Sequence, residues 1–110
     1  MSEAEFVIVL TTLPPDVDAA GFARTLLEER LAACVSLIPG AESFYWWEGQ
    51  IEQAQERQVL IKTTAERVDR LRERVTALHP YEVPELLILQ IADGHAAYLR
   101  WIRDSTALAG

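Results

Sequence analysis

Two segments of high β propensity meet at Glu48-Gly49, and they constrain the fold more than any other feature of the chain. The first ends in Ser43-Phe44-Tyr45-Trp46-Trp47, and the second begins at Ile51. Aromatic and β-branched residues favour strands, and the glycine supplies the positive φ that a tight hairpin turn requires. The sequence therefore predicts a hairpin over residues 35–63, whose strands exceed the usual length of about 5–6 residues.

A hairpin of this length also predicts an oligomer. It would project beyond the sheet of a small domain, and it would expose unpaired backbone groups together with the aromatic residues 44–47. Long exposed strand edges and exposed aromatic patches promote aggregation unless another chain covers them. We therefore expect subunits to associate through strand pairing.

Two details inside the hairpin are predictable. Pro39-Gly40 interrupts the first strand and indicates a kink or bulge, because both residues are poor strand formers. The end of the second strand alternates between two faces, with Gln58, Leu60 and Lys62 on one and Val59, Ile61 and Thr63 on the other.

Periodicity and capping signals predict the other elements. These are a strand at 6–10 that ends before Pro14-Pro15, a helix from Val17 to about Ala33 capped by Asp16, a helix from about 68 to 78 with a Thr63–Glu66 capping box, a strand at 85–91, and a short third helix capped by Asp93. Pro80 ends the second helix. The strand at 85–91 is apolar on nearly every residue, which is typical of a central strand covered on both faces.

The resulting order is β-α-β-β-α-β followed by a terminal helix. It predicts an α+β, ferredoxin-like sandwich, with helices on one face of an antiparallel sheet. A chain of 110 residues without linkers or repeats indicates a single domain over residues 1–110.

Composition excludes several classes of protein. The chain has 10 basic and 17 acidic residues and a net charge of -7, without a basic stripe, which argues against a nucleic-acid partner. Its single cysteine, Cys34, cannot form an internal disulfide and is typical of a reducing compartment. The N-terminus lacks the features of a signal peptide, and no apolar stretch approaches the ~20 residues of a membrane helix. We expect a soluble cytoplasmic protein without a membrane partner.

The segment His79-Pro80-Tyr81-Glu82-Val83-Pro84-Glu85 contains the best candidate metal ligands. Two prolines make it rigid, because each fixes its own backbone and restricts the residue before it. The imidazole of His79 is a candidate ligand for copper or another transition metal, and Glu85 is a candidate ligand for a hard cation. Alternatively, His79 interacts with the helix dipole as a C-terminal cation, and Cys34 packs as a small buried apolar residue.

No sequence motif indicates catalysis. The chain has no Gly-rich phosphate loop, HExxH pair or GxSxG elbow. Lys62 would need a depressed pKa to act as a base or nucleophile. We therefore expect no enzymatic activity.

The chain resembles the CutA family of divalent-cation-tolerance proteins. The matching motifs run in order over nearly the whole chain: Leu31-Ala32-Ala33-Cys34-Val35, Leu37-Ile38-Pro39-Gly40, Tyr45-Trp46-Trp47-Glu48-Gly49, Leu60-Ile61-Lys62-Thr63-Thr64, His79-Pro80-Tyr81, Pro84-Glu85, and Tyr98-Leu99 with Trp101. The resemblance implies a ferredoxin-like subunit in a homotrimer, similar in architecture to the PII signalling proteins. It also implies binding of copper or other divalent metal ions.

The resemblance further implies particular site residues. A cleft between subunits would hold Trp47, Glu56, Lys62 and Tyr98. His79, Cys34 and Glu85 are the candidate metal ligands. Some family members carry a histidine and a cysteine where this chain has Leu78 and Thr11, and neither substitute is a good copper ligand.

The resulting hypothesis is a trimeric divalent-cation-tolerance protein that binds copper or another divalent cation. The alternative is a PII-like small-molecule sensor or signalling trimer that uses the cleft between subunits. An enzyme using the same cleft, and a stable trimer that anchors other proteins, are further alternatives.

Overall fold

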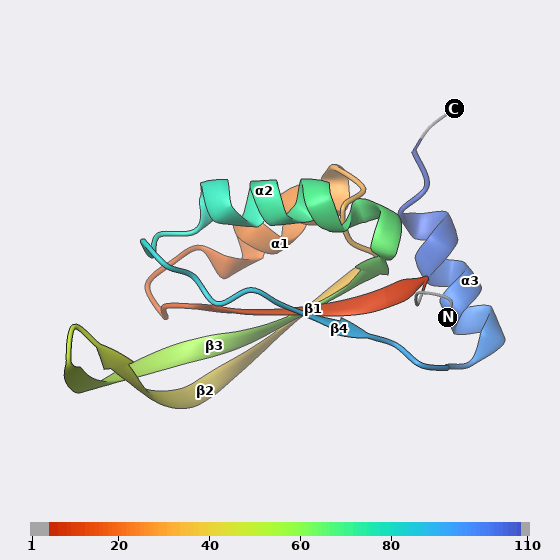
Figure 1. The fold of residues 1–110 in the computed structure, drawn as a ribbon. Coiled ribbons are helices and arrows are strands. Elements are labelled where there is room, and N and C mark those ends of the chain that lie inside the picture. The colour runs from red at the N-terminus through yellow and green to blue at the C-terminus, as the bar shows by residue number, and fades with distance from the viewer. Residues whose placement is uncertain (1–4, 109–110) are drawn as a thin grey trace.

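A computed structural model describes residues 5–108, which form a four-stranded antiparallel sheet and three helices. The elements are β1 (Phe6–Leu13), α1 (Ala19–Glu28), β2 (Cys34–Trp47), β3 (Gln50–Thr64), α2 (Val68–Leu78), β4 (Leu87–Gln90) and α3 (Ala96–Ser105). The strand order is β2-β3-β1-β4, and α1 and α2 lie side by side over one face of the sheet (Figure 1). The predicted β-α-β-β-α-β order with a terminal helix is confirmed.

The core lies between the sheet and the helices α1 and α2. Directly paired residues of antiparallel strands point to the same face of a sheet. The pairs Val7–Thr63 and Val9–Ile61 therefore lie on one face of β1 and β3, and this is the face that the helices cover. The predicted alternation of β3 is confirmed, because Val59, Ile61 and Thr63 are fully buried. The helices contribute the apolar side chains that complete this core: Ala19, Phe22, Leu26, Leu71 and Val75.

The opposite face of the sheet is also largely apolar, and we call it the open face. Its pairing registers bring together Ile8, Leu10, Leu60, Leu87 and Leu89. Leu87 and Leu89 are 54% and 47% exposed. The prediction of a central strand at 85–91 is therefore wrong: β4 is a four-residue edge strand, and it is apolar because it contributes to both the core and the open face.

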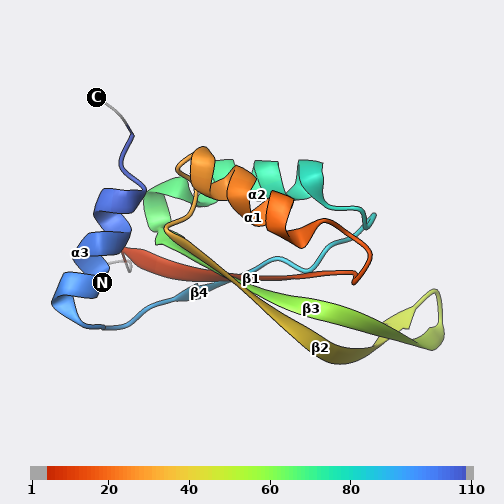
Figure 2. The same cartoon turned by 180° about the vertical axis from the view of Figure 1, so that it is seen from behind.

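The hairpin of β2 and β3 projects from the domain, as both views show (Figures 1 and 2). Its turn residues Glu48 and Gly49 have φ of 50° and 79°, as a type I′ turn requires, which confirms the predicted tight turn. The register shifts between Ile38 and Ala41, where Gly40 has φ of 83°. Because two residues of β2 oppose one residue of β3 there, the predicted interruption is a β-bulge.

The first helix differs from its prediction at both ends. Asp18 rather than Asp16 is the N-cap, and its Oδ1 accepts a hydrogen bond from the backbone N–H of Gly21 at 3.0 Å. The helix ends at Glu28 rather than near Ala33, in a Schellman motif in which the N–H groups of residues 30 and 31 donate to the carbonyls of residues 27 and 26. This end carries no glycine signal, because Arg30 takes the left-handed position with φ of 60°.

Two predicted caps do not form. The Thr63–Glu66 capping box is absent because β3 continues to Thr64 and leads into a 3-10 turn, while Thr63 points into the core. Asp93 does not cap α3 either, since its Oδ1 accepts from the neighbouring Gly94 N–H and His95 occupies the N-cap position without a side-chain bond. Within residues 5–108 no helix is both long and apolar enough to cross a bilayer.

We expect Thr63→Val to raise the free energy of unfolding by about 1–2 kcal/mol. Among the described residues, the buried Thr63 hydroxyl has no hydrogen-bond partner, and valine has nearly the same shape without the unpaired polar group. Denaturant titration would measure the change. Thr106→Val is the matched control, because the buried Thr106 hydroxyl donates a hydrogen bond to the Ile102 carbonyl at 2.9 Å. Removing this hydroxyl should lower the free energy of unfolding. A destabilised Thr63→Val variant would contradict the prediction.

Candidate functional site

A groove of about 850 Å³ separates the outer half of the hairpin from the segment that follows α2. Its lining residues are Thr12, Ser43, Phe44, Tyr45, Trp46, Trp47, Glu56, Pro80, Tyr81, Glu82, Val83, Pro84 and Glu85. The groove exists because β1 ends at Leu13, opposite Arg57. The edge of β3 that faces away from β2 therefore has no strand beside it before residue 57, and the proline-rich segment lies there instead. It contains three of the predicted site residues, namely Trp47, Glu56 and Glu85.

Glu56 is the most buried carboxylate of the groove, with only 7% of its surface exposed. The Tyr81 hydroxyl donates a hydrogen bond to its Oε2 at 3.1 Å. The sequence indicated Glu56 through the family resemblance alone, and it gave Tyr81 no role. The contact joins residues 25 positions apart, and only the rigid segment around Pro80 hinted that Tyr81 has a fixed position.

The environment of Tyr81 raises its pKa to about 12, chiefly because burial disfavours the phenolate and also because the Glu56 carboxylate lies beside it. The phenol therefore remains a neutral hydrogen-bond donor at physiological pH.

We expect the folded state to lose stability as the pH rises from 10 to about 12. The pKa of Tyr81 is higher in the folded chain than the ordinary value of 10, so its stabilising contribution is complete below pH 10 and disappears as the pH passes the folded value. Denaturant titrations across this range would measure the loss. Tyr81→Phe should show a smaller decline over the same interval, and identical declines in both proteins would contradict the assignment.

His79 is buried, with 8% of its surface exposed, and both of its ring nitrogens make hydrogen bonds to backbone groups. Its Nε2 lies 2.6 Å from the Thr12 carbonyl oxygen, which can only accept, so Nε2 carries the proton. Its Nδ1 accepts from the Tyr81 N–H at 3.1 Å. The imidazole therefore holds the groove segment against the end of β1, and it has no free lone pair. Metal ligation by His79 stays a prediction that requires one of these bonds to break.

Lys62 and Tyr98 lie in a second cluster at the other end of the open face. Cys34 pairs directly with Lys62 across the hairpin, and the Lys62 Nζ lies 4.0 Å from the Cys34 Sγ. The same Nζ is 6.0 Å from the centre of the Tyr98 ring, which in turn contacts Trp101 at 5.3 Å between ring centres. This end of the sheet thus carries a cationic group, the Lys62 ammonium, close to a thiol and two aromatic rings.

The two clusters are too far apart to form one site within a chain. Glu56 and Lys62 lie on the same face of β3 but six residues apart, which is about 20 Å at 3.3 Å per residue. The predicted cleft is thereby divided, with Trp47 and Glu56 at one end and Lys62 and Tyr98 at the other. The metal candidates are divided in the same way, since Cys34 lies with Lys62. Across residues 5–108, no three His, Cys, Asp or Glu side chains gather closely enough to hold a metal ion.

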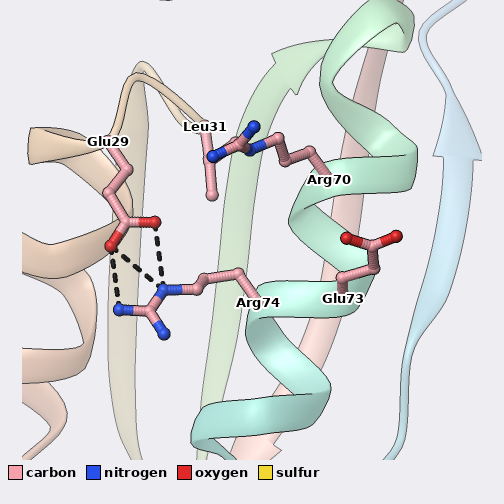
Figure 3. A pocket seen from close by; sticks show the side chains of 5 residues that line it. All are labelled: Glu29, Leu31, Arg70, Glu73 and Arg74. Carbon is pink, nitrogen blue, oxygen red and sulfur yellow. Dashed lines mark hydrogen bonds and ion pairs between the residues drawn. The ribbon is translucent and has the colours of Figure 1, made fainter.

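A second, smaller pocket of about 160 Å³ lies between the end of α1 and α2 (Figure 3). In it Arg74 makes a bidentate ion pair with Glu29, with nitrogen–oxygen distances of 2.9–3.0 Å. Arg70 and Glu73 also line the pocket. The contact links the end of α1 to α2, and the positive charge of Arg74 and the negative charge of Glu29 neutralise each other. We therefore assign it to the packing of the helices.

Comparison with known proteins identifies the family. Residues 7–105 match the sequence profile of the family described as CutA1 divalent ion tolerance protein. The "Divalent-cation tolerance protein CutA" of Thermus thermophilus is 48% identical over 99 residues, which is 90% of this chain and 96% of that protein. The protein of the same name from Pectobacterium atrosepticum is 46% identical over 99 residues, covering 90% of each chain.

Solved structures give the same result. The structure described as the divalent cation tolerance protein (Cut A1) from Thermus thermophilus has a TM-score of 0.88 at 47% identity, and the match covers 93% of this chain and 99% of that one. The CutA1 structure from Oryza sativa has a TM-score of 0.90 at 38% identity, covering 97% and 98%. Sequence and structure agree over nearly the entire length, and this chain therefore belongs to the CutA1 divalent ion tolerance protein family.

Proposed function

We propose that this protein is a homotrimer that binds divalent cations and contributes to divalent-cation tolerance, without catalysing a reaction of its own. The names of its relatives support the part in tolerance. We also propose a cytoplasmic location, in keeping with a chain whose single thiol has no partner for an internal disulfide.

The acidic character of the groove carries the proposal of cation binding. Glu56, Glu82 and Glu85 line it, and none of the described residues that line it is basic. Carboxylates without nearby cations create a negative potential that attracts a divalent ion. Their hard oxygen atoms suit magnesium, calcium or manganese, whereas copper would draw on His79 or Cys34. Because each chain brings too few ligands together, the site we propose is completed in the assembled protein.

The open face and the hairpin support the proposed trimer. Leucine and isoleucine side chains cover the open face, and the exposed aromatic residues of β2 project beyond the domain. Exposed apolar area of this kind typically marks a surface that another protein covers. The alternative of a PII-like sensor has no observation of its own in its favour.

Native mass spectrometry of the untagged protein, before and after equilibration with copper or manganese, tests both parts of the proposal. We expect three times the chain mass and an integral number of added metal ions. Glu85→Gln should bind less metal, because it removes a charged oxygen ligand from the groove. Glu48→Gln removes a carboxylate from the hairpin turn, outside the groove lining, and should bind as the unchanged protein does. A trimer that binds neither metal would refute the metal-binding part alone.

A further inference from the structure

Glu56 is a buried carboxylate that lines the groove without a counter-ion. Among the described residues, the hydrogen bond that its side chain makes comes from a neutral phenol, that of Tyr81. None of the ion pairs found within residues 5–108 involves Glu56. Burying a charge without an opposite charge is costly, so the base of the groove lacks a cation.

Aromatic rings lie next to this uncompensated charge. The pairing register places Tyr45 and Trp47 on the same face of the hairpin as Glu56. Tyr45 is also close enough to Tyr81 to contribute to the raised pKa of that phenol, so the aromatic wall reaches the base of the groove. The faces of aromatic rings attract alkylammonium groups, and they also pack against methylene chains. The groove therefore combines negative charge with surface that suits an organic cation.

The carboxylates of the groove are spread along it. Glu85 lies near Gln58, whose Nε2 is 3.5 Å from the Glu85 Oε2. Gln58 is two residues from Glu56 on the same face of β3, which is about 7 Å along the strand. These charges do not converge on one point, since no three potential metal ligands in the described part of the chain gather closely enough to hold an ion. An extended cation can meet charges that a single metal ion cannot.

We propose that the groove binds a linear aliphatic polyamine, whose ammonium groups are separated by short methylene chains. One ammonium group pairs with Glu56 beside the Tyr81 hydroxyl, and another pairs with Glu85. The methylene chain lies on the rings of Tyr45 and Trp47, as the three or four methylenes of lysine and arginine side chains lie on apolar surface. The proposal rests on the acidic groove of the proposed function, names an organic cation for it, and requires no bound metal.

Charge and surface together favour this ligand over other cations. A divalent metal ion needs several oxygen ligands around one point, and the aromatic wall offers it little. An ion with a single ammonium group would compensate Glu56 but leave Glu82 and Glu85 without a partner. None of the described residues that line the groove is basic, so no side chain there opposes a second positive charge.

Isothermal titration calorimetry of the intact, metal-free protein with spermidine, at physiological ionic strength, tests the proposal. We expect saturable binding with one spermidine per groove. Glu56→Gln should raise the Kd about tenfold, because the amide keeps the shape and can still accept from Tyr81 but lacks the charge. Trp47→Leu should raise it about threefold, because it removes an aromatic face.

Glu28→Gln is the matched control. It removes the same charge from an exposed position on α1, which covers the other face of the sheet, and it should leave the Kd unchanged. Equal weakening by Glu28→Gln and Glu56→Gln would show that spermidine only screens the net charge of -7, and this would overturn the proposal. A lack of saturable binding to the intact protein would overturn it as well.

Parallel titrations with manganese and copper separate this proposal from the proposed function. If spermidine binds and neither metal does, the polyamine site is supported and the metal-binding part of the proposed function is refuted. If a metal binds and spermidine does not, the polyamine site is refuted and metal binding is supported. Native mass spectrometry of each variant checks that its assembly is unchanged, so that a loss of binding reports on the groove.

Discussion

Replacing Leu87 and Leu89 together by glutamate is expected to convert the proposed trimer into monomers. Both side chains lie on the open face, about half exposed, and each stands directly opposite an apolar residue of β1. Burying a leucine side chain contributes about 1.5–3 kcal/mol, and a trimer would repeat the loss in every subunit. The substitution would also place unpaired carboxylates in the interface, which costs further free energy.

Sedimentation and native mass spectrometry would measure this effect as a fall to one third of the mass. Leu27→Glu is the matched control, because Leu27 is an exposed leucine on α1, which covers the other face of the sheet. The control should remain assembled. A double variant that folds and keeps the trimer mass would show that the open face is not the interface.

His79→Ala is expected to lower the free energy of unfolding by about 2–4 kcal/mol, which approaches the cost of truncating a large core residue. The substitution leaves the Thr12 carbonyl and the Tyr81 N–H without their partners, and it opens a cavity where the ring was buried. It also releases the segment that forms one wall of the groove. Denaturant titration in the presence of a chelator would measure the loss without a contribution from metal.

His95→Ala provides the control, because His95 is the only other histidine and its side chain makes no capping bond at the start of α3. His95→Ala should change the free energy of unfolding by no more than about 0.5 kcal/mol. If His79→Ala instead lost bound metal while its stability stayed unchanged, the imidazole would be a ligand and its role in holding the groove segment would be refuted. The prediction therefore distinguishes a metal ligand from a side chain that holds the groove segment in place.

Local signals in the sequence predicted those elements whose geometry is set locally. Glu48-Gly49 determines the turn, and Pro39-Gly40 marks the bulge, because both depend on the φ values that glycine permits. The end of α1 was mispredicted because Arg30 occupies a position where glycine is the usual signal. The last strand was misplaced in the sheet because an apolar run does not distinguish a strand buried by helices from one whose second face is left open.

The candidate site was predictable only in part, because its contacts join distant parts of the chain. The bond between His79 and the Thr12 carbonyl spans 67 residues, and no pattern in either segment indicates it. The contact between Cys34 and Lys62 follows from the pairing register of the hairpin, which the bulge alters and which the turn alone does not give. The family resemblance supplied Glu56 and Lys62 as site residues, but not the distance between them.

The bulge at Pro39-Gly40 determines which side chains of the outer hairpin share a face with Glu56. Before it, the even-numbered residues of β2 share a face with Lys62. After it, the odd-numbered residues do, which places Tyr45 and Trp47 on the same face as Glu56. Deleting one of the two bulge residues would leave a single residue of β2 opposite Arg57, so strict alternation would be restored with Tyr45 and Trp47 still on the face of Glu56. A deletion of two would instead shift the outer half of β2 by one residue relative to β3, and under strict alternation it would bring Phe44 and Trp46 to that face in place of Tyr45 and Trp47.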